Sequence, residues 1–137
     1  MQLEVLVPPS PRRARTGVAL HLLEPISFWG GVSPIDGALS DPRCARHGEA
    51  ISARVLFIRE LRGSSSGSSV LLELTYRHLA PSAIVLAEPD AILALGALVA
   101  SEMGWDAPGI FRLPASQQAS IPDDVTVSID ADGWICY

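Results

Sequence analysis

The sequence contains no lysine and no asparagine, and all ten of its basic residues are arginine. A lysine Schiff base, a P-loop and a Ser-Lys dyad each require a lysine, so these three kinds of site are excluded. The formal net charge of -5 disfavours nucleic-acid binding, because phosphate neutralisation requires a clustered basic surface. Only Arg12, Arg13 and Arg15 lie close together, and we interpret them as part of a solvated loop.

Cysteine is also scarce. Cys44 and Cys136 are far apart in the sequence, and neither has a CxxC partner. A disulfide framework or a metal-binding knuckle requires more cysteines at closer spacing. We therefore expect two free thiols and no metal ligands from this chain.

Long hydrophobic runs are absent. The apolar stretch from Ile92 to Ala100 is about half the length needed to cross a bilayer. The stretch from Met1 to Val7 carries Glu4 and leads into prolines, whereas a secretory signal has a basic start and a sustained apolar run. We expect a cytoplasmic protein that makes no membrane contact.

The composition is that of a folded protein, with 48% hydrophobic and 18% charged residues. A chain of 137 residues fits one domain with a single core, so we expect one domain over residues 1–137. Strand-like apolar patterns occupy residues 2–7, 17–24, 51–61 and 83–87.

Helical patterns occupy residues 69–79 and 91–103. In the first, Val70, Leu71, Leu74 and His78 share one face, and in the second Asp90 is placed as the N-cap. Residues 125–129 and 134–137 predict a closing hairpin. The pattern predicts an α/β fold, and we assign no chemistry to His21 or His78.

Two segments have the composition of a binding site. Residues 27–37 place Phe28 and Trp29 beside three glycines and a proline, which is typical of a turn. We expect the two aromatics to pack in the core, with an interface anchor as the alternative. Residues 62–68 form a Gly/Ser loop between a buried strand and a helix, which suits either an anion or a structural helix cap.

The two motifs, SFWGGV at residues 27–32 and RGSSSGS at residues 62–68, are similar in order and spacing to the aconitase X swivel family. The resemblance covers more than half of the chain. It implies a single swivelling β/β/α domain like the mobile domain of aconitase. It also implies an iron-sulfur dehydratase whose cluster is bound by a separate large subunit, since two distant thiols do not suffice to bind one.

The resemblance makes Ser64, directly after Arg62-Gly63, the expected catalytic proton acceptor. A serine hydroxyl is a weak base, so its alkoxide must be stabilised by N–H donors, a helix N-terminus or a cation. Six residues form the expected substrate-binding site around Ser64. These are Arg62, Gly63, Ser65, Ser66, Gly30 and Gly31. The alternatives are an exposed charge at Arg62 and helix capping by Ser65 and Ser66.

The sequence departs from the family pattern at one loop. Residues 41–48 read DPRCARHG where the family usually has Asp-x-x-His-Pro, and Ser33 replaces a usual Asp. Either Cys44 replaces the family histidine or His47 takes over its role through a local shift. The sequence leaves both alternatives open.

The resemblance implies dehydration of a small carboxylate substrate, either 3-hydroxyproline in bacteria or phosphorylated mevalonate in archaea. The absence of lysine and asparagine beside abundant arginine, alanine and glycine is typical of a GC-rich bacterial genome and favours hydroxyproline. A third hypothesis is a non-catalytic swivel or interaction module. A larger cysteine-bearing partner would speak against that hypothesis.

Overall fold

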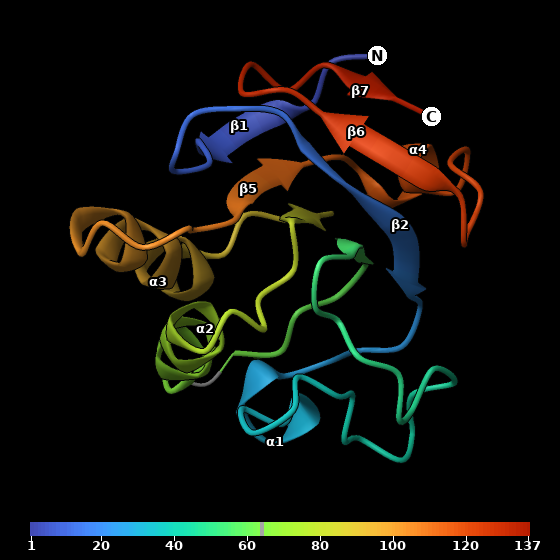
Figure 1. Cartoon of the computed structure of the whole chain (residues 1–137). Coiled ribbons are helices and arrows are strands. Elements are labelled where there is room, and N and C mark those ends of the chain that lie inside the picture. Colours follow the sequence, from blue (N-terminus) through green and yellow to red (C-terminus); the bar gives the residue numbers. More distant parts are fainter. Residues whose placement is uncertain (64) are drawn as a thin grey trace.

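A curled mixed sheet forms the centre of the computed structural model, which describes residues 1–63 and 65–137 (Figure 1). In the described residues its strands follow the order β1-β5-β4-β3-β2-β6-β7. Their bounds are β1 Glu4–Val7, β2 Arg15–Leu22, β3 Val55–Ile58, β4 Ala83–Leu86, β5 Gly109–Arg112, β6 Thr126–Ile129 and β7 Ile135–Cys136.

The four central strands, β2 to β5, are parallel, whereas β1, β6 and β7 add antiparallel edges. The two edges approach each other, because the Leu3 N–H donates to the Gly133 carbonyl at 2.8 Å and the Ile135 N–H donates to the Met1 carbonyl at 3.2 Å. These contacts curl the sheet around an interior, as the upper part of Figure 1 shows.

Both faces of β3 and β4 are buried, which explains the continuous apolar sequences of these two strands. On β3, Val55 and Phe57 point into the core inside the curl, whereas Leu56 and Ile58 point into the core beneath the helices. Strands β4 and β5 alternate in the same way. Because successive side chains of a strand point to opposite faces, one apolar segment supplies two separate cores.

Helices α2 (Gly67–Tyr76) and α3 (Ala91–Glu102) lie side by side over the outer face (Figure 1). A Cβ at Gly96 would lie 3.1 Å from the carbonyl oxygen of Ser68, so glycine permits their close approach. Two short helical turns, α1 Phe28–Gly31 and α4 Ala115–Gln118, complete the elements of the described residues.

Several local predictions are confirmed. Asp90 caps α3 by accepting a 2.8 Å hydrogen bond from the Leu93 N–H. The closing hairpin of β6 and β7 forms around Asp130, and the α/β fold class is confirmed.

Other local predictions are wrong. His78 does not share the buried face of α2, because the helix ends at Tyr76 and His78 has a φ of 60° with an exposed side chain. The strand predicted over residues 51–61 is confined to Val55–Ile58. Strand β5 was not predicted because its sequence GIFR has neither an alternating nor a sustained apolar pattern, and helix α4 was not predicted because it is a single turn.

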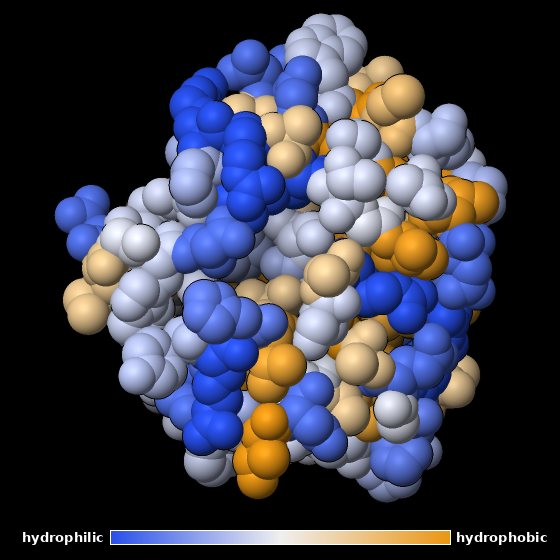
Figure 2. All heavy atoms as spheres, in the orientation of Figure 1, coloured by the Kyte–Doolittle hydropathy of each residue, from blue (hydrophilic) through white to orange (hydrophobic). Residues whose placement is uncertain are grey.

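The surface mixes polar and apolar residues over the face drawn in Figure 2. Among the described residues, no helix has both the length and the apolar content for a membrane crossing.

His21 is half-buried, and its ring stacks on Phe57 with centroids 4.6 Å apart. Burial lowers the pKa of His21, so the neutral imidazole is favoured.

Candidate functional site

The segment Phe28–Gly31 is a type II turn in its dihedral angles. Trp29 has φ −72° and ψ 114°, and Gly30 has φ 81° and ψ −16°. A type II turn needs a residue with positive φ at its third position, which explains the glycine. The turn directs Phe28 into the core at 1% exposure and Trp29 outward at 62%. The predicted core packing is therefore confirmed for Phe28 and wrong for Trp29.

Ser40 joins this turn to the following loop. Its N–H donates to the Gly31 carbonyl at 2.9 Å, and its hydroxyl donates to the Gly30 carbonyl at 3.0 Å. The next residue, Asp41, begins the loop of residues 41–49. Thus the loop that departs from the family pattern is fixed directly to the Gly30-Gly31 turn.

Asp41 and Arg43 form a forked ion pair. Asp41 Oδ1 accepts from the Arg43 backbone N–H at 2.9 Å and from Nε at 3.1 Å, and Oδ2 accepts from Nη2 at 3.1 Å. The Asp41 side chain is 10% exposed and that of Arg43 is 80% exposed. Hydrogen bonding by the Arg43 guanidinium lowers the pKa of Asp41, so the carboxylate stays charged.

The rest of this loop is anchored in two ways. Cys44 is buried in the core beneath the helices, and burial raises the pKa of its thiol. Arg46 pairs with Glu49, with Asp123 at 2.5 Å and with Asp124 at 2.8 Å. Because Asp123 and Asp124 precede β6, these ion pairs attach the loop to the segment that leads into β6.

Arg62 follows β3 at the carboxyl end of the parallel strands. Its N–H donates to the Ile26 carbonyl at 2.8 Å, which fixes its backbone. Its side chain is 65% exposed, and Nε lies 3.7 Å from the Glu60 carboxylate. A group at this distance is a loose ion pair rather than a hydrogen bond, so the guanidinium remains accessible.

The remaining residues of the Gly/Ser loop lie beside Arg62. Gly63 is exposed, and no described atom lies within 4 Å of where its Cβ would be. Ser65 is exposed and its carbonyl accepts from the Ser68 hydroxyl, whereas Ser66 is the N-cap residue of α2. Ser64 lies outside the described residues, so its role as proton acceptor stays a prediction.

A pocket of about 300 Å³ brings the turn, the loop and Arg62 together. Its lining consists of Pro25, Ser27, Trp29, Gly30, Gly31, Asp41, Pro42, Arg43 and Arg62. Three of the residues predicted from the sequence, Gly30, Gly31 and Arg62, therefore share one pocket. Gly63, Ser65 and Ser66 are not among the residues that line it.

A small hollow next to the pocket is lined by Arg62, Gly63, Gly67 and Asp90, among others. Gly67 begins α2 and Asp90 caps α3, so the amino ends of both helices lie beside Arg62. Helix amino termini carry partial positive charge and unsatisfied N–H groups. The amino end of α2 therefore adds partial positive charge beside Arg62, whereas the Asp90 carboxylate already caps the amino end of α3.

Comparison with known proteins assigns the chain to a family. The family model for the aconitase X swivel domain matches residues 10–136, which include every predicted site residue. This chain belongs to the aconitase X swivel domain family. A crystal structure of Thermococcus kodakaraensis aconitase X in the holo form has a TM-score of 0.79 and 26% identity, covering 98% of this chain and 95% of that one.

Two relatives differ in their named activities. A cis-3-hydroxy-L-proline dehydratase from Pseudomonas aeruginosa is 48% identical over 88 residues, which are 64% of this chain and 15% of that protein. A phosphomevalonate dehydratase small subunit from Methanothermobacter thermautotrophicus is 34% identical over 116 residues, 85% of each chain. The chain thus spans a small part of the first relative and most of the second.

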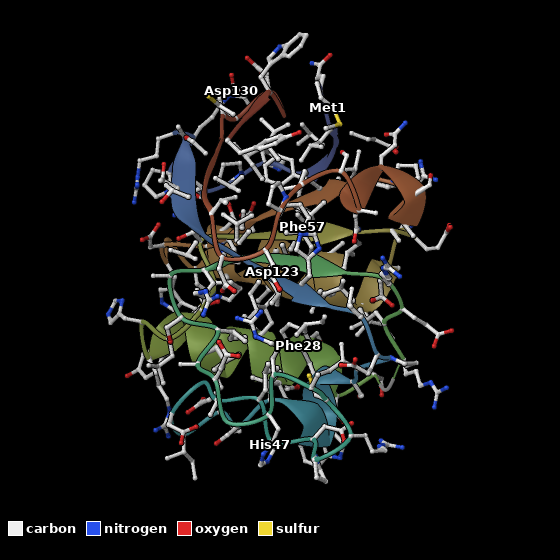
Figure 3. The ribbon with its side chains drawn as sticks, turned by 90° about the vertical axis from the view of Figure 1, so that its right-hand side faces the viewer. Met1, Phe28, His47, Phe57, Asp123 and Asp130 are labelled. Atoms are coloured by element: carbon white, nitrogen blue, oxygen red, sulfur yellow. The ribbon has the colours of Figure 1, made fainter. Side chains whose placement is uncertain are left out.

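The site departs from the family pattern at residues 41–48, and neither candidate for the usual histidine lines the pocket. Cys44 is buried in the core. His47 is exposed and lies at the end of the domain opposite Asp130 (Figure 3). The residues that this loop places in the pocket are Asp41, Pro42 and Arg43, which sequence reasoning did not select.

The described residues do not fit an iron-sulfur cluster. Among them, no group of three or more histidine, cysteine, aspartate or glutamate side chains is placed to bind a metal ion. Cys44 is enclosed in the core, and Cys136 is exposed on β7, the last strand. Any cluster used by an enzyme that contains this domain must have its ligands elsewhere.

Proposed function

We propose that this chain is the small subunit of an iron-sulfur hydro-lyase that converts cis-3-hydroxy-L-proline to pyrroline-2-carboxylate together with a large subunit. One observation carries the proposal: the two family motifs, distant in sequence, meet where Gly30, Gly31 and Arg62 line a single pocket. The named activities of the relatives support a dehydratase.

A large subunit as partner is supported by two facts. Relatives of similar length carry the name small subunit, and the region matched in the Pseudomonas relative is 15% of that protein. The exposed Trp29 and Arg62 leave the pocket bordered by solvent on one side. We place the cluster and its cysteine ligands in the large subunit, which then closes the pocket.

In the proposed reaction, Ser64 accepts the proton from the carbon that bears the carboxylate. The electron pair of that C–H bond forms a carbon–carbon double bond as the hydroxyl group leaves the neighbouring carbon as hydroxide, so that the proton on the serine and the hydroxide together make up the water that is lost. Arg62 and the amino end of α2 stabilise negative charge on the serine oxygen and on the substrate carboxylate. Gly30 and Gly31 allow the substrate to approach the backbone closely.

Hydroxyproline is favoured over phosphomevalonate by similarity and by charge. Identity is 48% to the hydroxyproline enzyme and 34% to the phosphomevalonate subunit. The two arginines of the pocket are balanced by Asp41, which lines it, and by Glu60, which pairs with Arg62. A nearly neutral pocket suits a zwitterionic amino acid better than a phosphate with two negative charges. The near-complete coverage of the phosphomevalonate subunit keeps that substrate as the alternative.

The test is turnover by the assembled enzyme. The chain is co-expressed with its large subunit without oxygen, and the loss of cis-3-hydroxy-L-proline is compared with the loss of phosphomevalonate. We expect turnover of hydroxyproline alone. Turnover of phosphomevalonate alone would replace the proposed substrate, and turnover of neither by a cluster-loaded complex would favour a non-catalytic module.

Ser64→Ala tests the proposed proton acceptor in the same complex. Loss of a general base typically lowers kcat by about 10²- to 10⁴-fold. The matched control is Ser69→Ala, which removes an exposed hydroxyl from the first turns of α2. Activity retained by Ser64→Ala, with both variants assembling normally, would overturn the role of the serine.

A further inference from the structure

Arg43 has the placement of a ligand-binding group. It lines the pocket together with Arg62. Among the described residues that line this pocket, Arg43 and Arg62 are the two basic ones. Its side chain is 80% exposed although it forms an ion pair. An exposed arginine held in one orientation is suited to bind a planar carboxylate.

The pair with Asp41 leaves part of the guanidinium available. The fork uses Nε and Nη2, and Arg43 Nη1 makes no hydrogen bond within residues 1–63 and 65–137. Asp41 in turn has both carboxylate oxygens engaged by Arg43. The nearest negative charge is therefore already paired and opposes an incoming anion less than a free carboxylate would.

The loop that carries Arg43 is held before any ligand arrives. Ser40 fixes its start to Gly30 and Gly31, and the Ala45 N–H donates to the Glu24 carboxylate at 3.0 Å. The burial of Cys44 fixes the residue directly after Arg43. Because a preorganised group loses little entropy on binding, Arg43 can contribute most of its hydrogen-bond energy to the ligand.

We propose that Arg43 is a substrate-binding residue that holds the substrate carboxylate through Nη1, opposite Arg62, with Asp41 as the group that orients it. This inference rests on the proposed dehydratase function, because it concerns the same pocket. It gives the departure of residues 41–48 from the family pattern a role: the loop supplies an arginine to the pocket.

The experiment uses the assembled enzyme with Arg43→Gln, and Arg12→Gln is the matched control. Arg12 also forms an exposed arginine–aspartate pair, with Asp132 at 2.7 Å, in a part of the chain that does not line this pocket. We expect Arg43→Gln to raise KM at least about tenfold with a smaller change in kcat, since a charge-assisted hydrogen bond is lost. Arg43→Lys should restore part of the affinity.

Two unreactive probes separate charge recognition from a general disturbance. Pyrrole-2-carboxylate and its neutral amide, pyrrole-2-carboxamide, are compared as competitive inhibitors. Wild type and Arg12→Gln should prefer the acid, and Arg43→Gln should lose most of that preference. An unchanged preference and an unchanged KM in Arg43→Gln would overturn the inference.

A double variant tests whether the unpaired Asp41 carboxylate, rather than the loss of Arg43, weakens binding of the acid in Arg43→Gln. Asp41→Asn with Arg43→Gln removes both charges, and we expect the same loss of preference for the acid as in Arg43→Gln alone. Retained preference in the double variant would also contradict the inference. The KM comparison is independent of the substrate, because the variants are assayed with whichever substrate the wild-type enzyme turns over, whereas the two pyrrole probes apply where that substrate is hydroxyproline.

Discussion

The two segments that meet at the pocket are held in different ways. Residues 41–49 are anchored by side chains, through the Asp41–Arg43 fork, the buried Cys44 and the ion pairs of Arg46. Arg62 is anchored by its backbone and makes only a loose ion pair with Glu60. Both arginine side chains are exposed, but Arg43 is held by a forked ion pair whereas Arg62 has one loose partner.

This difference suggests a division of labour within the site. A side chain held by several partners contributes binding with little loss of entropy. A side chain with one loose partner retains its freedom to pair with groups from another subunit. We infer that Arg43 positions the substrate and that Arg62 responds to the large subunit and the substrate together.

We expect the largest difference between the anchored loop of residues 41–49 and an exposed part of the chain in the reactivity of their thiols. Cys44 is buried and its pKa is raised by burial, whereas Cys136 is exposed. A raised pKa lowers the thiolate fraction at pH 8, and reaction also requires the loop to open. In the isolated chain, a thiol reagent such as DTNB should react with Cys44 on the order of 100-fold more slowly than with Cys136. The rate for each thiol is measured in the variant that lacks the other, Cys136→Ala for Cys44 and Cys44→Ala for Cys136. Equal reaction rates in the two variants would show that the loop around Cys44 opens readily.

The next effect is on stability. Arg46→Ala removes three ion pairs from a side chain that is 21% exposed, and we expect a loss of about 1–2 kcal/mol in the free energy of unfolding, because its three partners are 36–62% exposed and remain solvated. Arg62→Ala should change stability by less than about 0.5 kcal/mol, because its one ion pair is exposed. Urea unfolding measures both. A cost for Arg62→Ala as large as that for Arg46→Ala would break the comparison.

The smallest effect concerns pH. The Arg43 side chain lowers the pKa of Asp41, so the pair stabilises the loop above the ordinary pKa of an aspartate and is lost as the pH falls through the lowered pKa. In Arg43→Gln the pKa of Asp41 should rise toward its ordinary value, and the acid-induced change in the loop should occur at higher pH. An NMR titration of the Asp41 carboxyl carbon measures the shift. Identical titration in wild type and variant would mean that the fork does not persist in solution.

Local sequence signals predicted the elements with their own start and stop residues. Asp90 caps α3, and the predicted hairpin of residues 125–137 forms as β6 and β7. Strand β5 escaped prediction because Gly109 and Arg112 leave it two adjacent apolar residues, which is neither an alternating nor a sustained apolar pattern. It is a strand because it pairs with both β4 and β1. The exposure of Trp29 depends on the type II turn at Gly30, which the glycine permits but does not dictate.

The sequence by itself determined the α/β class, the position of the main helices and the likeness to the aconitase X swivel family, because caps, periodicity and motifs are local features. Only the tertiary structure decided that residues 27, 29–31, 41–43 and 62 line one pocket, since hydrogen bonds from Ser40 and Arg62 join parts of the chain that are far apart in sequence. It also decided that Arg43, and not Cys44 or His47, reaches that pocket. Which side of a loop faces a cavity depends on distant packing partners, here the core around Cys44 and the carboxylates around Arg46.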